Sequence, residues 1–366
     1  MDLSVVIPCL NESETIATCI EKAKKEIQKL NISAEIIVSD NGSTDGSIQI
    51  SEKMGAKVFP CLEKGYGSAV INGINNSQGK YILIADADDS YNFEDLPIFY
   101  KKINEGYDLV QGCRMPSGGG KIEKGAMPIS HRIIGNPMFS FLGKIFYSLP
   151  FNDVYCGMKI LRKNFFKNAN FFSKGMVFCL EILIKSKVLN AKVSEVPITL
   201  FKDGRKNAKS HLKTISDGLK TLKFVLICCP KWLYFFPSLF FFLTVPMTYL
   251  VLDRLSSFEM FEIVSVNIVL FFLSFQFFML GLFASLRAKQ LGLYNGKWLS
   301  TFFNIFNLKF AFFISAFLII GSILMQLTGV QIFTEEINFI FLNFLIFFSI
   351  NLIANSLVIS LLSLDK

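Results

Sequence analysis

The feature that most constrains this chain is a series of long apolar runs in its C-terminal part. Each run has about the 20 residues that a helix needs to cross the hydrocarbon core of a bilayer. The runs cover roughly residues 233–252, 263–286, 310–330 and 339–362. We therefore expect a helical membrane domain with four transmembrane helices over residues 233–366.

Composition changes sharply at Trp232. The residues after it contain 6 Lys and Arg, 6 Asp and Glu, and 26 of the 40 Phe in the chain. The formal net charge of +8 therefore belongs entirely to the residues up to Trp232. At 52% hydrophobic residues, the whole chain is too apolar for an ordinary soluble enzyme. A basic water-soluble domain followed by a membrane domain explains both observations.

The N-terminal part is organised around residues 81–90, where an apolar run is followed by two carboxylates, Asp86 and Asp88. The run has the length and composition of a buried strand in a parallel sheet. Ligands of open α/β sheets bind outside the carboxyl ends of the strands, so both carboxylates are expected at the ligand edge. They are placed to share one divalent cation, Mg²⁺ or Mn²⁺. A solvated acidic turn is the alternative interpretation.

Strands and helices alternate on both sides of this run. We expect a helix that opens at Asn11 or Ser13, which would cap it, and that continues to about residue 30. The alternation predicts a doubly wound α/β domain with a mostly parallel, Rossmann-like sheet. The expected strands are 3–7, 34–38, 57–59, 81–84 and 107–116, with further helices ending near residues 54 and 79.

Four segments together resemble glycosyltransferase family 2. They are residues 5–12, 40–46, 64–67 and 86–88, and they follow the order and spacing of that family. The resemblance implies a GT-A-type fold, a nucleotide-sugar donor and a divalent metal held by Asp86 and Asp88. It also implies a set of donor-binding residues, namely Pro8, Asn11, Glu12, Asp40, Gly65, Gly67 and Asp86. Asn41 departs from the family, because many members carry a second Asp there. Gly65 and Gly67 also suit a plain turn before a helix.

Four later segments are residues 153–159, 175–181, 195–200 and 203–210. Their order looks like the polyprenyl-phosphate branch of this family, similar to the dolichyl-phosphate mannose and glucose synthases. By that resemblance Arg114 joins Asp86 and Asp88 as a catalytic residue, and the reaction inverts the anomeric centre. The resemblance assigns basic residues to the acceptor phosphate, namely Arg114, Arg132, Arg205 and Lys209. Ser90 stands where the mannose synthases have Gln, which leaves a third protein ligand to the metal in doubt.

Several other positions have two interpretations that the sequence leaves open. Asp45 either caps a helix or binds a ligand. Asp153 either organises the site or belongs to a turn, and Glu181 either orients the sugar or pairs within its own helix. The glycine run at residues 118–120 forms either a lid or an ordinary surface loop. The apolar residues between 138 and 149 fit either a core helix or an interfacial helix.

An amphipathic segment precedes the first apolar run. Apolar residues recur there at helical spacing and lysines flank them, which indicates a helix lying in the membrane interface. A packed surface helix is the alternative. The stripe consists of Leu212, Ile215, Leu219, Leu222 and Leu226, with Lys213, Lys220 and Lys223 beside it. We therefore divide the chain into a catalytic domain (1–210), a juxtamembrane helix (211–232) and a membrane domain (233–366).

Loop charges predict the orientation in the membrane. The loop between the second and third runs contains only basic charged residues, from Arg287 to Lys309, whereas Glu335 and Glu336 precede the fourth run. The positive-inside rule then places the catalytic domain and the C-terminus in the cytoplasm of a multi-pass inner (plasma) membrane protein. The N-terminal residues contain no basic leader, so we expect no signal peptide. The eight scattered Cys predict reduced thiols and no structural zinc.

These expectations combine into one function, the metal-dependent transfer of a sugar from a nucleotide diphosphate to undecaprenyl or dolichyl phosphate. We expect no nucleic-acid partner, and a homo-oligomer is left open. One rival function is a processive polysaccharide synthase, although the Gln-x-x-Arg-Trp signature of that class is absent. The other rival is a non-catalytic membrane scaffold with a decayed enzyme domain.

Overall fold

The structure is a computed structural model that describes residues 1–206, 214–227, 229–249, 257–330 and 335–363. The chain divides into two compact units, Met1–Val225 and Leu226–Lys366. Each unit is described by itself below.

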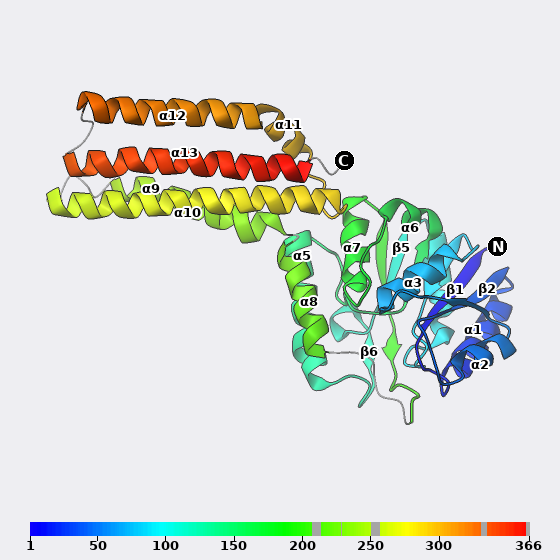
Figure 1. Cartoon of the computed structure of the whole chain (residues 1–366). Helices are drawn as coiled ribbons and strands as arrows, with labels where there is room; N and C mark the ends of the chain where they lie inside the picture. Colours follow the sequence, from blue (N-terminus) through cyan, green and yellow to red (C-terminus); the bar gives the residue numbers. More distant parts are fainter. Residues whose placement is uncertain (207–213, 228, 250–256, 331–334, 364–366) are drawn as a thin grey trace. The chain divides into compact units, whose positions relative to one another are not determined.

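The first unit is built on a seven-stranded sheet with strand order β3-β2-β1-β4-β7-β5-β8 (Figure 1). All neighbours pair in parallel except β7, which is antiparallel to both β4 and β5. The predicted mostly parallel sheet is thus confirmed. The strands are β1 (Leu3–Cys9), β2 (Ala34–Asp40), β3 (Lys57–Pro60), β4 (Tyr81–Ile84), β5 (Leu109–Cys113), β7 (Lys159–Arg162) and β8 (Val193–Pro197).

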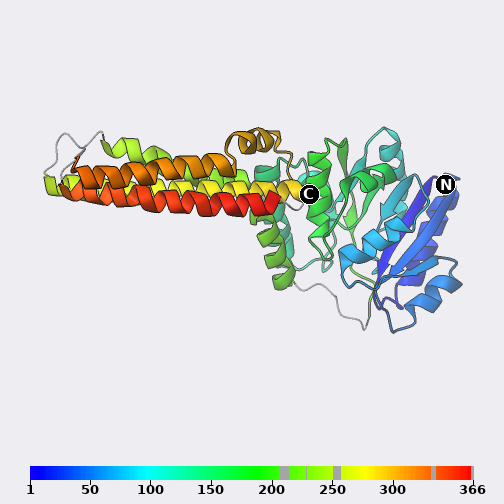
Figure 2. The ribbon, with the colours of Figure 1, turned by 45° about the horizontal axis from the view of Figure 1, so that its top comes forward.

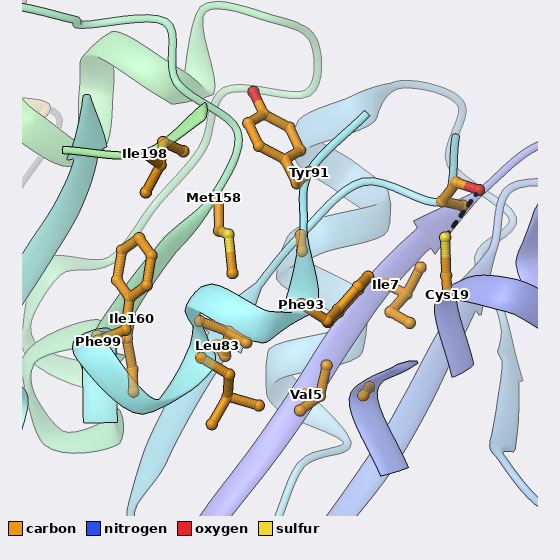
Figure 3. Close-up of a cluster of buried hydrophobic side chains, with 14 of the residues drawn as sticks. Val5, Ile7, Cys19, Leu83, Tyr91, Phe93, Phe99, Met158, Ile160 and Ile198 are labelled. Atoms are coloured by element: carbon orange, nitrogen blue, oxygen red, sulfur yellow. Dashed lines mark hydrogen bonds between the residues drawn. The ribbon is translucent and has the colours of Figure 1, made fainter. Parts of the chain in front are cut away.

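Helices cover both faces of this sheet (Figure 1). One group consists of α1 (Ile16–Leu30), α2 (Ser47–Lys53) and α4 (Leu96–Asn104), and the other of α3 (Tyr66–Asn75), α6 (Lys163–Ala169) and α7 (Phe178–Val188). Between the sheet and the first group, Val5, Ile7 and Leu83 meet Cys19 and Phe93 in a buried core (Figure 3). Burial of each large apolar side chain contributes about 1.5–3 kcal/mol.

The start of α1 was predicted wrongly. The helix begins at Ile16 and its N-cap residue is Thr15, which makes no side-chain capping bond. Asn11 adopts a left-handed backbone with φ 54°. Its amide oxygen accepts a hydrogen bond from the backbone N–H of Thr44 at 2.8 Å. The side chain that looked like a cap therefore joins two loops at the edge of the sheet.

A smaller subdomain flanks the carboxyl edge of the sheet. Its two-stranded sheet pairs β6 (Lys121–Ile122) with β9 (Thr199–Leu200), and a π-helical turn, η3 (His131–Gly135), leads into α5 (Asn136–Tyr147). Helix α8 (Thr214–Ile227) lies beside α5, because the Tyr147 hydroxyl donates to the Val225 carbonyl at 2.9 Å. Residues 118–120 form a turn bonded to Met115 and Pro116. An added Cβ at Gly118 or Gly120 would collide with Cys113.

Helices α5 and α8 both leave apolar side chains in solvent. On α5, Phe139 is buried whereas Phe141 is 60% exposed, so one side of the helix packs against the core and the other faces solvent. On α8, Ile215 is 78% and Leu219 61% exposed, and the face that packs carries Thr221 and Val225. These two residues of the predicted stripe therefore point away from the core, whereas Leu222 and Leu226 are half-buried. Leu212 and Lys213 lie outside the described residues.

The second unit consists of long helices that run side by side (Figure 2). They are α9 (Phe236–Tyr249), α10 (Ser257–Gln290), α12 (Leu308–Thr328) and α13 (Glu335–Ser363). The π-helical turn η4 (Lys231–Phe235) leads into α9, and the short α11 (Lys297–Ile305) precedes α12. Three of them are long and apolar enough to cross a membrane. The number of candidate membrane spans rises to four if α8 and the η4–α9 segment are taken together as one broken span. Residues 250–252 of the first expected run lie outside the described residues.

Polar side chains join helices within this second unit. Gln276 on α10 donates to the amide oxygen of Asn351 on α13 at 2.7 Å, and Asn355 donates to the same oxygen at 2.5 Å. Ser238 on α9 and Ser274 on α10 exchange hydrogen bonds with each other's carbonyl groups. Such bonds fix neighbouring helices at a defined register in an apolar surrounding.

Candidate active site

A cavity of about 510 Å³ lies at the carboxyl edge of the sheet. The end of β4, the end of β5, η3, α5 and α8 all contribute to its wall. Its polar lining includes Tyr66, Asp86, Asp88, Arg114, His131 and Arg205. The volume lies in the range of about 300–1,000 Å³ that is usual for small-molecule sites. The cavity therefore has room for a ligand and contains several of the predicted residues.

Asp86 lies two residues after the end of β4, and its side chain is half-buried. Its Oδ1 atom has no hydrogen-bond partner among the residues that the structure describes. Burial and, second, the charge of Asp88 raise the pKa of Asp86 to about 7. The Tyr66 hydroxyl is close enough to lower this pKa in part, but it forms no hydrogen bond of ordinary geometry with the carboxylate. An unpaired buried carboxylate is unfavourable unless it serves a ligand.

Asp88 is oriented by the turn that contains it. The Ser90 backbone N–H and hydroxyl donate to its Oδ1 at 3.1 and 2.6 Å. Its Oδ2 lies 3.6 Å from the Arg205 guanidinium. The Ser90 side chain is therefore engaged with Asp88, in a position where the resemblance left a third metal ligand in doubt.

The two carboxylates fit a hard divalent cation. In the described part of the chain, no group of three His, Cys, Asp or Glu side chains could hold a metal. Mg²⁺ and similar ions commonly use one or two carboxylates and complete their shell with water and substrate phosphates. An unpaired Asp86 oxygen beside Asp88 agrees with that kind of site.

Arg114 follows β5 and is held by Asp153, which is fully buried. Its Nε and Nη2 atoms donate to the two Asp153 oxygens at 2.7 and 2.8 Å, and its backbone N–H donates at 3.0 Å. Its Nη1 donates to the Tyr91 hydroxyl at 3.3 Å. Burial opposes the charge of Asp153, but the Arg114 pairing keeps the pKa of that carboxyl below its usual value. Asp153 therefore fixes the direction of the Arg114 side chain.

A second buried pair joins two residues that were predicted for different ligands. The Arg205 Nε donates to Glu12 Oε2 at 2.8 Å, and its Nη2 contacts Glu12 Oε1. The side chains are only 9% and 6% exposed. Glu12 belongs to the predicted donor set and Arg205 to the predicted acceptor set. In this structure each is paired with the other across 193 residues of sequence.

The predicted nucleoside loops support one another. The Asp40 carboxylate at the end of β2 accepts from the backbone N–H groups of Gly42 and Ser43 at 2.9 and 3.0 Å. The strand register places Asp40 beside Cys9, and Pro8 precedes that residue on β1. Asp45 accepts from the backbone N–H groups of Ser13 and Ser47 at 2.9 and 3.1 Å, so it works as a loop organiser.

Asn41 uses its amide in a way that aspartate could not. Its Nδ2 donates to the carbonyls of Cys61 and Glu63 at 3.2 and 2.8 Å, and its Oδ1 accepts from the Gly65 N–H at 2.8 Å. A carboxylate would face two carbonyl oxygens without a donor. The departure from the family pattern thus stabilises the loop before α3.

Gly65 and Gly67 have a packing explanation. Gly65 has φ +129°, and an added Cβ would collide with the Lys174 carbonyl oxygen. At Gly67 an added Cβ would lie 3.0 Å from the Gly175 carbonyl oxygen and 2.9 Å from Phe178 Cβ. The chain therefore needs glycine at both positions so that residues 173–175 can approach α3.

The remaining basic residues differ in placement. Arg132 is exposed on η3, while its neighbour His131 lines the cavity. Lys209 lies outside the described residues. Partial burial and, second, the charge of Arg114 lower the pKa of His131, which favours a neutral imidazole. Sequence reasoning missed His131 and Tyr91; the only signal for His131 was that histidine is rare in this chain.

Glu181 pairs within its own helix. It lies 2.8 Å from Lys185 one turn later, and both side chains are buried. It also accepts from the backbone N–H groups of Phe172 and Ser173. Of the two interpretations, the pairing within the helix is therefore the one observed.

Residues 4–169 match the sequence model of the family described as glycosyl transferase family 2. This segment contains the sheet from β1 to β7 and the Asp86 turn. The chain therefore carries a glycosyltransferase family 2 domain, and the GT-A-type fold expected from the sequence is confirmed. A crystal structure of a mycobacterial protein is 18% identical, with a TM-score of 0.50 over 62% of this chain and 74% of that one. That likeness concerns the fold alone.

Two relatives come from Haloferax volcanii. The low-salt glycan biosynthesis hexosyltransferase Agl6 is 32% identical over 64% of this chain and 56% of its own length. A dolichyl-phosphate hexose transferase is 29% identical over 54% of this chain and 82% of its own length. The chain thus spans little more than half the length of the first relative. The second name agrees with the polyprenyl-phosphate branch expected from the motifs.

Proposed function

We propose that this protein transfers a hexose from a nucleotide-sugar to a polyprenyl phosphate, undecaprenyl or dolichyl, at a membrane surface. One observation carries the proposal. The cavity combines the Asp86–Asp88 carboxylates with buried arginines, and it opens beside helices α5 and α8, which expose apolar side chains. The relative named dolichyl-phosphate hexose transferase supports the same acceptor class.

Asp86 and Asp88 would hold the divalent cation, Mg²⁺ or Mn²⁺. When bound, such an ion supplies Lewis-acid neutralisation of the diphosphate leaving group. The loops around Pro8, Asn11 and Asp40 would hold the nucleoside beside it. They lie at the same edge of the sheet because parallel strands end there together.

Activation of the acceptor phosphate requires cationic side chains that position it, and it requires no general base. A phosphate monoester already carries a charge of about −1.5 to −2 at neutral pH, so its oxygen is a ready nucleophile. Arg205 would leave Glu12 and bind this phosphate with its planar guanidinium fork. One edge of the Arg114 guanidinium, Nε and Nη2, is taken by Asp153, and Nη1 donates to the Tyr91 hydroxyl. Arg114 also lines the cavity. Attack from the face opposite the leaving diphosphate inverts the anomeric centre.

The lipid tail of the acceptor requires a membrane at the cavity entrance. Phe141 on α5 and Ile215 and Leu219 on α8 expose most of their apolar surface. Helices of this kind lie with that face in the interface between headgroups and acyl chains. A phosphate at headgroup level would then reach the cavity while its tail stays in the bilayer. The loop charges support a cytoplasmic location for this face.

The rival functions make different products. A polysaccharide synthase would yield a long water-soluble polymer, and a scaffold would turn over no donor. We expect membranes that contain the protein, given labelled nucleotide-sugars and polyprenyl phosphate, to form a chloroform-soluble, mild-acid-labile lipid with one sugar. Label found only in polymer, or no turnover with any donor of a broad panel, would contradict the proposal.

Arg205 provides a sharper version of this test. Arg205→Ala should raise the KM for polyprenyl phosphate far more than the KM for the donor. Lys206→Ala is the matched control, because Lys206 is an exposed neighbouring cation. Glu12→Gln in the Arg205→Ala background shows whether a freed Glu12 carboxylate, rather than a lost phosphate contact, causes the defect.

A further inference from the structure

We propose that Lys22 on α1 is a positioning residue for Asp88, because it clamps the next residue, Asp89, in a left-handed backbone conformation. The inference rests on the proposed function, in which Asp88 holds a divalent cation. Lys22 is not among the residues that line the cavity, and it belongs to none of the motifs that indicated the family.

Asp89 is a non-glycine residue with a positive φ of 61°. L-residues disfavour this region, although Asp and Asn tolerate it better than most. The left-handed turn brings Ser90 back toward the preceding residue, so that its N–H and hydroxyl both bond to Asp88 Oδ1. Asp88 Oδ2 is then left on the side that faces Arg205 and the cavity. The direction of the Asp88 carboxylate thus depends on the backbone of Asp89.

Helix α1 holds this turn at two points. The Lys22 ammonium donates to both Asp89 oxygens at 2.7 and 3.0 Å. One turn earlier, the Cys19 thiol donates to the Ala87 carbonyl at 3.4 Å (Figure 3). The helix itself is fixed by Ile16 and Ile20, which are buried in the core. Helix α1 is thus anchored in the core, and its Lys22 holds the Asp88–Ser90 turn through an ion pair with both Asp89 carboxylate oxygens.

Loss of the clamp has a predictable consequence. Without Lys22, Asp89 can relax to a negative φ, and the Ser90 donors rotate away from Asp88. The carboxylate then samples several directions, and a bound cation must select one of them. The strain of a left-handed residue corresponds to roughly a fivefold to thirtyfold loss in affinity.

The sign of the effect separates positioning from simple electrostatics. Lys22 carries a positive charge near the cation site. If it acted only through its field, its removal would tighten binding of a cation, because repulsion would fall and Asp89 would become an unpaired anion. The clamp predicts the opposite, weaker binding.

The test measures the Kd of Mn²⁺ alone for the full chain in detergent, from the loss of the free-ion electron paramagnetic resonance signal. Lys22→Met should weaken binding by about fivefold or more. Lys22→Arg, which can still pair with both carboxylate oxygens, should bind within about twofold of the unsubstituted protein. Lys25→Met is the matched control, since Lys25 is an exposed lysine of the same helix.

A glycine background makes the test specific. Glycine adopts positive φ freely, so Asp89→Gly removes the need for a clamp. In that background Lys22→Met should change the Kd by less than about twofold. An equal loss in both backgrounds, or tighter binding by Lys22→Met, would overturn the inference. If the unsubstituted protein and the Lys25→Met control bind no Mn²⁺ at millimolar concentration, the proposed metal site itself fails as well.

Discussion

The buried pair between Arg114 and Asp153 should dominate the stability of the first unit. Asp153→Asn keeps the volume but leaves a guanidinium that is only 9% exposed without its counter-charge. Removal of one partner from a buried pair typically costs about 3–5 kcal/mol. For a unit of this size, 1 kcal/mol shifts the unfolding midpoint by about 2–4 °C, so we expect a decrease of roughly 6–20 °C.

Buried thiols provide the assay. Cys9, Cys19, Cys113, Cys156 and Cys179 are free and buried in the first unit. A fluorogenic thiol reagent therefore reports the unfolding of this unit in the full-length protein. Tryptophan fluorescence would report the other unit, because the chain has only two Trp, at 232 and 298.

Two comparisons test the reasoning behind this prediction. Glu105→Gln breaks an exposed pair with Lys102, which should contribute about 0–1 kcal/mol and shift the midpoint little. Arg114→Met combined with Asp153→Asn removes the uncompensated charge and should be more stable than Asp153→Asn alone. A midpoint for Asp153→Asn equal to that of Glu105→Gln, or a double variant less stable than the single one, would refute the reasoning.

Other predictions concern the metal, the topology and pH. Asp88→Asn and excess EDTA should each abolish sugar transfer, and full activity in EDTA would exclude the metal role. In a Cys-free protein in intact cells, an impermeant thiol reagent should label a cysteine placed at Glu335 but not one at Lys297; the reverse pattern would invert the topology. Burial and, second, the charge of Glu94 raise the pKa of Asp95 to about 6, so its unfavourable effect on stability appears as pH rises through 6. Asp95→Asn should therefore raise the unfolding midpoint at pH 8 but not at pH 4, and equal midpoint shifts at both pH values would contradict that origin.

Asp153 provides a pH dependence of the opposite sign. Its folded pKa is depressed, so its stabilising pairing is fully present above the unfolded pKa of about 3.9. It is lost as pH falls through the folded value. Asp153→Asn should flatten the acid limb of the stability curve, and an unchanged acid limb in that variant would show that other carboxylates control it.

The family and the alternation of strands and helices along the chain were readable from the sequence because they rest on local patterns. Short apolar runs that end in polar turns mark buried parallel strands, and the Asp86–Asp88 spacing fixes a carboxylate pair at the end of one of them. The antiparallel strand β7 was not anticipated. It is only four residues long, begins with the buried Lys159 and ends with Arg162, so its composition does not resemble a core strand.

What the tertiary structure decided is which side chains meet. The family resemblance assigned Glu12 and Arg205 to different ligands, yet they form one ion pair across 193 residues of sequence. Asp153 and Arg114 pair for the same reason, since only the folded sheet brings the end of β5 to the turn before β7. The local sequence pattern determines where a strand ends. Two charged side chains that are distant in sequence meet only when the strands that carry them align in the folded sheet, so no periodicity in the sequence predicts their contact.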